Sequence, residues 1–66
     1  MKLNISKIKI ILAERDMTRA ALAEACGISR QNVSTILTRG TCEPRTAGKL
    51  AKGLGVPVSE IVMEEE

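Results

Sequence analysis

Residues 30–38 concentrate short, uncharged side chains that both donate and accept hydrogen bonds. On a helix, with about 100° between successive residues, the apolar residues of this segment share one sector: Val33, Ile36 and Leu37. Gln31 and Thr35 then lie on the opposite side. A solvated helix face favours Glu and Lys, which are better helix formers and make i,i+4 ion pairs. Amides and hydroxyls are instead suited to planar hydrogen-bonding partners, such as the edges of nucleic-acid bases.

The outward side of this segment supplies the candidate base contacts. Glutamine and asparagine can form two hydrogen bonds with adenine, arginine can do the same with guanine, and a threonine methyl group can touch that of thymine. The candidates are Arg30, Gln31, Asn32, Ser34 and Thr35. The alternative is a polar surface helix of weak helix propensity, and the preceding residues help to choose between the two.

The chain before this segment predicts a short helix and a tight turn. Thr18 is a good N-cap residue, and the run 19–26 after it is rich in alanine and other strong helix formers. Gly27 supplies the left-handed residue that ends such a helix, and Ser29 caps the next one. Two short helices joined by a glycine turn outline a helix-turn-helix, whose second helix enters the major groove of DNA. This context favours base reading by residues 30–38.

An earlier helix is expected to begin after Asn4 and to run to about Arg15. Its helical spacing produces one apolar stripe, from which Ile10 is left out. The stripe consists of Ile5, Ile8, Ile11 and Leu12.

Two further helices are expected after the helix-turn-helix. One begins at Pro44 or is capped by Thr46, and it ends at Gly55. The other is a short helix over Val58–Met63, which closes the core with two apolar residues, Ile61 and Val62. The sequence therefore predicts an all-α fold of five short helices in one domain over residues 1–63. An acidic tail at 64–66 is expected to fray.

Basic and hydroxyl residues near residues 30–38 are candidate phosphate contacts, which position a protein on DNA without reading its sequence. The set is Thr18, Arg19, Thr38, Arg39, Thr41, Arg45 and Lys49. Arg39 and Thr41 are expected in the loop after the third helix, and Lys52 is expected to be simply solvated. Each residue taken singly is as well explained as a solvated surface group.

The charge distribution also fits an anionic partner. The formal net charge of the 66 residues is only +2, but all ten Lys and Arg residues lie in the first 59 positions, with only four of the eight acids. No carboxylate occurs between Glu24 and Glu43. An acid-free stretch of this kind suits an anion on one face.

The residue types of this chain do not support catalysis or metal binding. The chain has no histidine, no nucleophile–base constellation and no phosphate-binding glycine loop, so no catalytic, metal or cofactor residue and no small-molecule ligand is assigned. Cys26 is expected in the core and Cys42 as an exposed free thiol, which indicates a reducing compartment. No segment approaches the ~18 apolar residues of a membrane span, so a soluble cytoplasmic protein is expected.

Residues 17–36, MTRAALAEACGISRQNVSTI, resemble the Cro/C1-type (XRE) helix-turn-helix family, whose pattern is L-T-x-x-x-L-A-x-x-x-G-[VI]-S-x-x-x-[VI]-S-x-[IL]. Residues 54–56, Leu-Gly-Val, resemble the sequence that precedes the last helix of that family. The resemblance covers roughly residues 5–62. It implies a five-helix, lambda-repressor-like domain that binds double-stranded operator DNA as a homodimer and regulates transcription, most simply as a repressor. In that family, the base-facing surface comes from the residues that match Arg30, Gln31, Asn32, Ser34 and Thr35, and phosphates are met by those that match Arg19 and the loop after the third helix.

Two departures from the family pattern matter. The family often pairs an arginine of the first helix with a glutamate near the end of the third, whereas this chain has Leu12 and Leu37 at those positions. Replacing a buried ion pair by packed apolar residues need not weaken a fold. The loop after the third helix is also one residue longer before Gly40, and the connection at residues 44–46 is shorter.

The alternative function is a protein-interaction module, such as an antitoxin-like partner protein, that keeps the fold without the DNA role. Several apolar residues have no obvious place in the core: Met1, Leu3, Ile10 and Met63. They would form a homodimer interface or a surface for another protein, unless the N-terminal residues simply cover the last helix. Bases concentrated around the third helix favour DNA.

Overall fold

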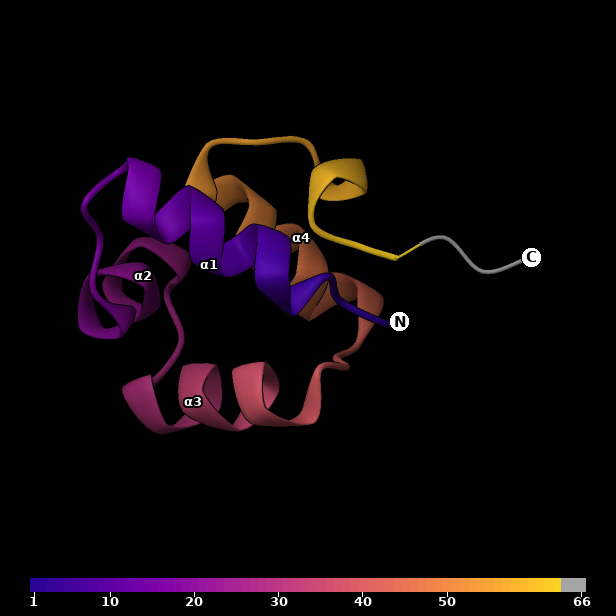
Figure 1. The fold of residues 1–66 in the computed structure, drawn as a ribbon. Coiled ribbons are helices and arrows are strands. Elements are labelled where there is room, and N and C mark those ends of the chain that lie inside the picture. The colour runs from indigo at the N-terminus through magenta and orange to yellow at the C-terminus, as the bar shows by residue number, and fades with distance from the viewer. Residues whose placement is uncertain (64–66) are drawn as a thin grey trace.

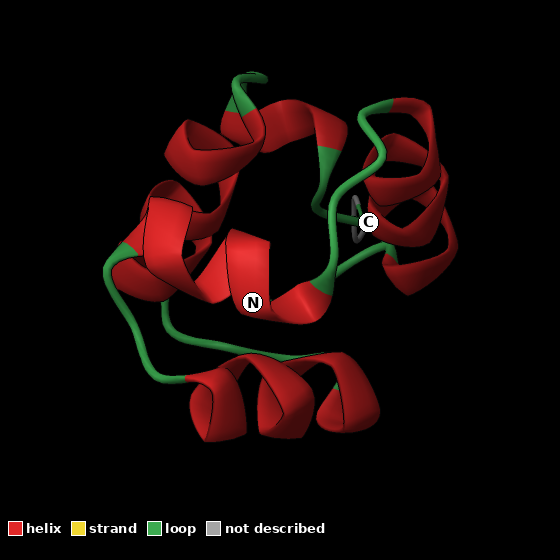
Figure 2. Cartoon of the chain, turned by 90° about the vertical axis from the view of Figure 1, so that its left-hand side faces the viewer, coloured by secondary structure: helices red, strands yellow, loops and turns green. Residues whose placement is uncertain are grey.

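This computed structural model describes residues 1–63. These residues form four α-helices and one 3₁₀ turn, joined by loops (Figure 1). They are α1 (Ile5–Glu14), α2 (Arg19–Cys26), α3 (Arg30–Arg39), α4 (Pro44–Leu54) and the 3₁₀ turn η1 (Val58–Glu60). Figure 2 draws none of the described residues as a strand. The predicted all-α fold is confirmed. The predicted fraying of residues 64–66 lies outside the described residues.

The helix starts follow the capping residues of the sequence. The side-chain oxygens of Asn4, Thr18 and Ser29 each accept the backbone N–H three residues further on, with N···O distances of 3.1, 3.0 and 3.1 Å. These bonds satisfy N–H groups that have no partner within the helix. Helix α4 begins differently, because Pro44 occupies its first turn and Glu43, at the N-cap, makes no side-chain cap bond. This decides the start of α4 in favour of Pro44.

The turn between α2 and α3 depends on Gly27, which has a φ of 72°. This left-handed conformation costs little for glycine and is strained for residues with a Cβ. Its N–H bonds back to carbonyls of α2, and Ile28 N–H donates to the Ala23 carbonyl at 3.1 Å. The turn therefore fixes the direction in which α3 leaves α2.

Helix α2 packs against both α3 and α4. Side chains from all four helices and from Ile61 meet in one aliphatic core, whose largest fully buried members are Ile8, Leu22, Val33, Leu50, Leu54 and Ile61. Leu12 and Leu37 are both buried in this core. The apolar replacement of the family's ion pair therefore lies where its packing contributes to the fold.

Residues 1–4, here called the N-terminal strap, lie between two other segments of the chain. Isolated antiparallel bridges pair Lys2 with Thr41 and Leu3 with Val62. N–H groups of the strap donate to the carbonyls of Gly40 and Ile61, both at 2.8 Å, and its carbonyls accept from Cys42 at 3.1 Å and Met63 at 3.0 Å. The strap thereby joins the α3–α4 loop to the end of the described chain.

The strap explains why one expectation was wrong, and it decides between two alternatives for the N-terminal residues. A helix over Val58–Met63 does not form beyond Glu60, because the backbone of residues 61–63 bonds to the strap instead. Ile61 and Val62 still close the core, as expected. Leu3 is a core residue that is only 3% exposed and pairs with Val62, so the N-terminal residues cover the end of the described chain, as the alternative stated. Within residues 1–63, no helix has the length and apolar character needed to cross a membrane.

Candidate nucleic-acid interface

Helix α3 lies at one edge of the molecule, at the bottom of Figure 1. Val33 and Leu37 are buried against the core and Ile36 is partly buried, so the apolar sector predicted for this helix faces inward. Most of the polar residues on the other side are exposed. The helix is therefore held by one side and presents the opposite side to solvent.

The predicted base contacts fall into two groups on this outward side. Gln31, Ser34 and Thr35 line a shallow hollow of about 290 Å³, together with Thr38 and Arg39. Ser34 is half-buried, whereas Gln31 and Thr35 are exposed. Asn32 and Arg30 are exposed but do not line this hollow. The structure therefore brings three of the five predicted residues together and places the other two beside them.

A second hollow, of about 280 Å³, lies between α3, the α3–α4 loop and the start of α4. Its polar lining is Asn32, Thr35, Arg39, Thr41, Glu43 and Thr46. Thr35 and Arg39 line both hollows, so they lie on the boundary between them. The outward side of α3 and the loop after it thus meet in two adjoining hollows that are lined mainly by polar residues.

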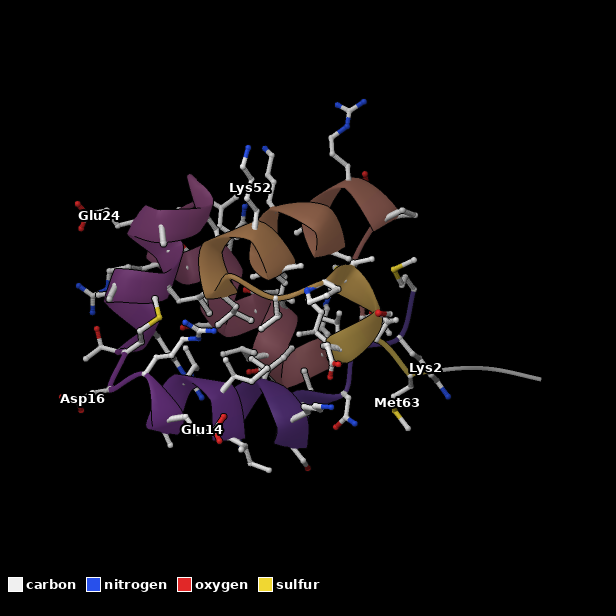
Figure 3. All side chains as sticks on the ribbon, turned by 90° about the horizontal axis from the view of Figure 1, so that it is seen from above. Lys2, Glu14, Asp16, Glu24, Lys52 and Met63 are labelled. Carbon is white, nitrogen blue, oxygen red and sulfur yellow. The ribbon has the colours of Figure 1, made fainter. Side chains whose placement is uncertain are left out.

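The predicted phosphate contacts are distributed around α3 rather than gathered in one place. Thr18 and Arg19 are exposed at the start of α2, and Arg45 and Lys49 are exposed on α4, and none of the four lines either hollow. Thr38 lines the first hollow and Thr41 the second. Figure 3 shows Lys52 on the side of α4 away from α1, exposed as expected.

Arg39 is not in the loop where the sequence analysis placed it. Helix α3 continues through Arg39, and Gly40, with a φ of 74°, forms its C-cap. The Gly40 N–H donates to the Ile36 carbonyl at 2.8 Å, which closes the last turn. The longer loop of this chain is therefore partly an extra helical residue.

Glu43 is a residue of this surface that the sequence analysis did not select. It is exposed and lines the second hollow. The sequence feature that could have identified it is that Glu43 is the only carboxylate between Glu24 and Glu60. It brings a negative charge to the second hollow, whose other charged lining residue is Arg39.

The bases around α3 have no carboxylate partner within the described residues. The one ion pair within 4 Å among residues 1–63 joins Lys7 of α1 to Glu60 of η1, where both side chains are nearly half exposed. Such an exposed pair contributes little to stability. The positive charges of α2, α3 and α4 therefore remain available to an anionic ligand.

The two cysteines are free thiols with different surroundings. Cys26 is buried, as expected, and burial raises its pKa above the ordinary value of 9.0, while a backbone hydrogen bond from Gly53 acts in the opposite direction. Cys42 was expected to be exposed, but it is half-buried and packs against the core. Burial raises its pKa too, against the lowering effect of the N-terminal ammonium, and Glu43 adds to the increase.

Within residues 1–63, no three acidic or cysteine side chains lie close enough together to hold a metal ion.

The sequence model of the Cro/C1-type HTH DNA-binding domain matches residues 7–63 of this chain. The chain belongs to this family. It is also similar to the cryptic phage CTXphi transcriptional repressor RstR of Vibrio cholerae, with 36% identity over 63 residues. The alignment covers 92% of this chain and 56% of the relative, so the chain spans little more than half of that protein. No solved structure matches the chain.

Membership of the Cro/C1-type family assigns the helix-turn-helix to α2, the Gly27 turn and α3, as the sequence predicted. The match begins within α1 and includes the residues after η1, so it covers the elements that form the core. Within this DNA-binding domain, the outward side of α3 is exposed and polar.

Proposed function

We propose that this chain is a transcriptional regulator, acting as a repressor, that binds double-stranded operator DNA by inserting α3 into the major groove. The observation that carries the proposal is the outward side of α3, which is exposed, rich in amides and hydroxyls, and held in place by buried apolar residues on the other side. A helix with this surface fits the width of the major groove and the donors and acceptors of base edges. The similarity to a phage repressor supports the regulatory role.

Base reading is proposed for the residues that the first turns of α3 present: Arg30, Gln31, Asn32, Ser34 and Thr35. Gln31 and Thr35 are exposed and lie opposite the buried sector of α3, so they are the first candidates for direct contact with a base pair. Ser34 is half-buried at the side of the helix and is suited to a contact at the edge of the groove. Each bidentate contact of this kind contributes about 1–3 kcal/mol of discrimination against a wrong base.

Phosphate binding is proposed for residues at the margins of α3: Thr18, Arg19, Thr38, Thr41, Arg45 and Lys49. The Thr18 hydroxyl oxygen already accepts the Ala21 N–H at 3.0 Å, which leaves its own hydrogen free to donate to a phosphate oxygen. Arg19 adds a charge beside the N-terminal amides of α2, which themselves attract anions. Thr41 is held in position by its bridge to Lys2.

A homodimer on DNA follows from the same proposal. Two copies of α3 related by a two-fold axis would lie about 34 Å apart, one turn of DNA, and the operator would be roughly palindromic. Exposed apolar side chains are available for an interface: Met1, Ile10, Val58 and Met63, which are 52%, 58%, 40% and 53% exposed. Because its target is operator DNA, the protein would act in the cytoplasm of a bacterial cell, as one domain over residues 1–63.

The second candidate function is a protein-interaction module, and the same exposed apolar residues favour it. The two functions differ in their dependence on salt. Binding to DNA releases counterions, so its affinity falls steeply as salt rises, whereas contact between apolar surfaces does not weaken in this way.

The test is selection of bound sequences from a pool of random duplexes, followed by footprinting on the enriched sequence. The proposal expects one enriched, roughly palindromic motif and protection across two successive major grooves. Recovery of unenriched sequences, together with binding that does not depend on salt, would contradict it.

A further inference from the structure

Arg39 lies at the C-terminal end of α3 and not in the loop that follows. It is the last residue of α3, its side chain is exposed, and Gly40 turns the chain away directly after it. The backbone of Arg39 is therefore fixed by the helix, and the direction of its side chain is set by the helical repeat.

That direction is the reading side of α3. Arg39 follows Thr35 by four residues and Gln31 by eight, so the three lie along one side of the helix. The arrangement of the hollows agrees, because Arg39 lines the first with Gln31 and Thr35 and the second with Asn32 and Thr35. No other charged residue lines both hollows.

The guanidinium group of Arg39 is also uncommitted within the described chain. Among residues 1–63 no carboxylate lies within 4 Å of it, although Glu43 lines the second hollow with it. Arginine presents a planar fork of donors, and the best match to this fork on a base edge is guanine, which offers two acceptors in the major groove.

We propose that Arg39 is a specificity-determining residue that reads a guanine in the operator. The proposal rests on the function proposed above and changes the role that the sequence alone gave to Arg39, which was phosphate contact. Gln31 and Arg39 are eight residues apart, so their Cα atoms are about 12 Å apart along the helix axis. Base pairs are stacked about 3.4 Å apart along the DNA axis, and the groove is inclined to that axis, so Arg39 reads a guanine no more than three to four base pairs from the base that Gln31 contacts.

Two other roles for Arg39 make different predictions. A phosphate contact would weaken binding to every sequence alike and would be kept by lysine, which binds phosphate as a point charge. A cation in the last turn of a helix also interacts favourably with the helix dipole and so stabilises the helix. Loss of this interaction would lower thermal stability without altering sequence preference.

The experiment compares Arg39→Lys and Arg39→Gln with matched variants of a proposed phosphate contact, Arg45→Lys and Arg45→Gln. Each protein, first shown to fold by circular dichroism, is used for selection from the random duplex pool. Its affinity is then measured on the selected site and on every single-base variant of that site. Wild-type protein in the same assay tests the proposed function separately, because failure of wild type to enrich any motif contradicts that function before Arg39 is considered.

The expected result is that both Arg39 variants lose preference at one guanine per half-site and keep it elsewhere. Discrimination at that position should fall by about 5- to 150-fold, the range for one bidentate contact. The Arg45 variants should keep the whole motif, with Arg45→Gln weaker on all sequences. If wild type enriches a motif and Arg39→Lys retains every base preference, the inference is overturned while the proposed function stands. It is also overturned if the Arg39 variants differ from wild type only in melting temperature.

Discussion

Replacing Gly53 by alanine should destabilise the fold through a contact that can be measured in the structure. A Cβ at this position would lie 2.4 Å from the sulfur of Cys26 and 3.2 Å from its backbone nitrogen, where α4 crosses the end of α2. Real Cβ atoms do not approach this closely, so α2 or α4 must move. Overpacking of this kind costs about 1–3 kcal/mol.

Gly48→Ala is the matched control, because Gly48 lies in the same helix and a Cβ there would meet nothing within 4 Å. Alanine is favoured over glycine in a helix by about 1 kcal/mol, and this gain applies to both variants. Gly48→Ala should therefore raise stability by about 1 kcal/mol, and Gly53→Ala should fall below it by the overpacking cost, about 1–3 kcal/mol. For a domain of this size the two melting temperatures should differ by about 4–24 °C.

Thermal and urea denaturation of the two variants, followed by circular dichroism, measures this difference. Adding Cys26→Ala to Gly53→Ala removes the sulfur and should recover part of the loss, although the backbone contact at 3.2 Å remains. If Gly53→Ala is as stable as Gly48→Ala, the close crossing of α2 and α4 described here is wrong.

Three further predictions concern binding and pH. Gln31→Ala should weaken binding to the selected operator by about 1–3 kcal/mol and relax preference at one position, measured by competition with single-base variants. Arg19→Ala should weaken binding to all duplexes alike and reduce the slope of log affinity against log salt by about 1; identical behaviour of these two variants would refute the division between reading and positioning. Burial raises the pKa of the Cys26 thiol above 9.0, so the folded state keeps a proton that the unfolded state loses above that pH. Stability from this group is complete below pH 9 and is lost as pH rises further, so unfolding measured from pH 7 to 10.5 should show a decline that is smaller in Cys26→Ala. An equal decline in both proteins would exclude Cys26 as its source.

The elements of the fold that depend on neighbouring residues were predictable from the sequence. The caps Asn4, Thr18 and Ser29 are local signals, since each side chain bonds to a backbone group three residues away. The turn at Gly27 is equally local, because it depends on the conformation of one residue. These signals were sufficient to predict the helix-turn-helix and the inward sector of α3.

The features that sequence reasoning missed depend on contacts between distant residues. Residues 61–63 have a helical pattern but bond to the N-terminal strap, which is nearly sixty residues away in sequence. Leu3, which is part of this strap, is buried through the same pairing. Its pairing with the α3–α4 loop also accompanies the half-burial of Cys42, which composition alone had suggested to be an exposed loop residue.

The candidate site shows the same division. The outward side of α3 was predictable because it follows from the helical repeat and the position of three apolar residues. The second hollow was not, because Glu43 and Thr46 reach it only through the path of the α3–α4 loop. The role proposed for Arg39 differs from the phosphate contact expected from the sequence because α3 ends one residue later than expected. This places the Arg39 side chain on the helix.

The central claim, that the outward side of α3 binds DNA, can be tested directly by nuclear magnetic resonance. The chain has one glutamine and two asparagines, so three side-chain amide groups give separate signals: Gln31 and Asn32 on α3, and Asn4 at the cap of α1. On titration with the selected duplex, the amide signals of Gln31 and Asn32 should shift strongly while that of Asn4 shifts far less. A strong shift of Asn4 with unchanged signals from Gln31 and Asn32 would contradict the claim.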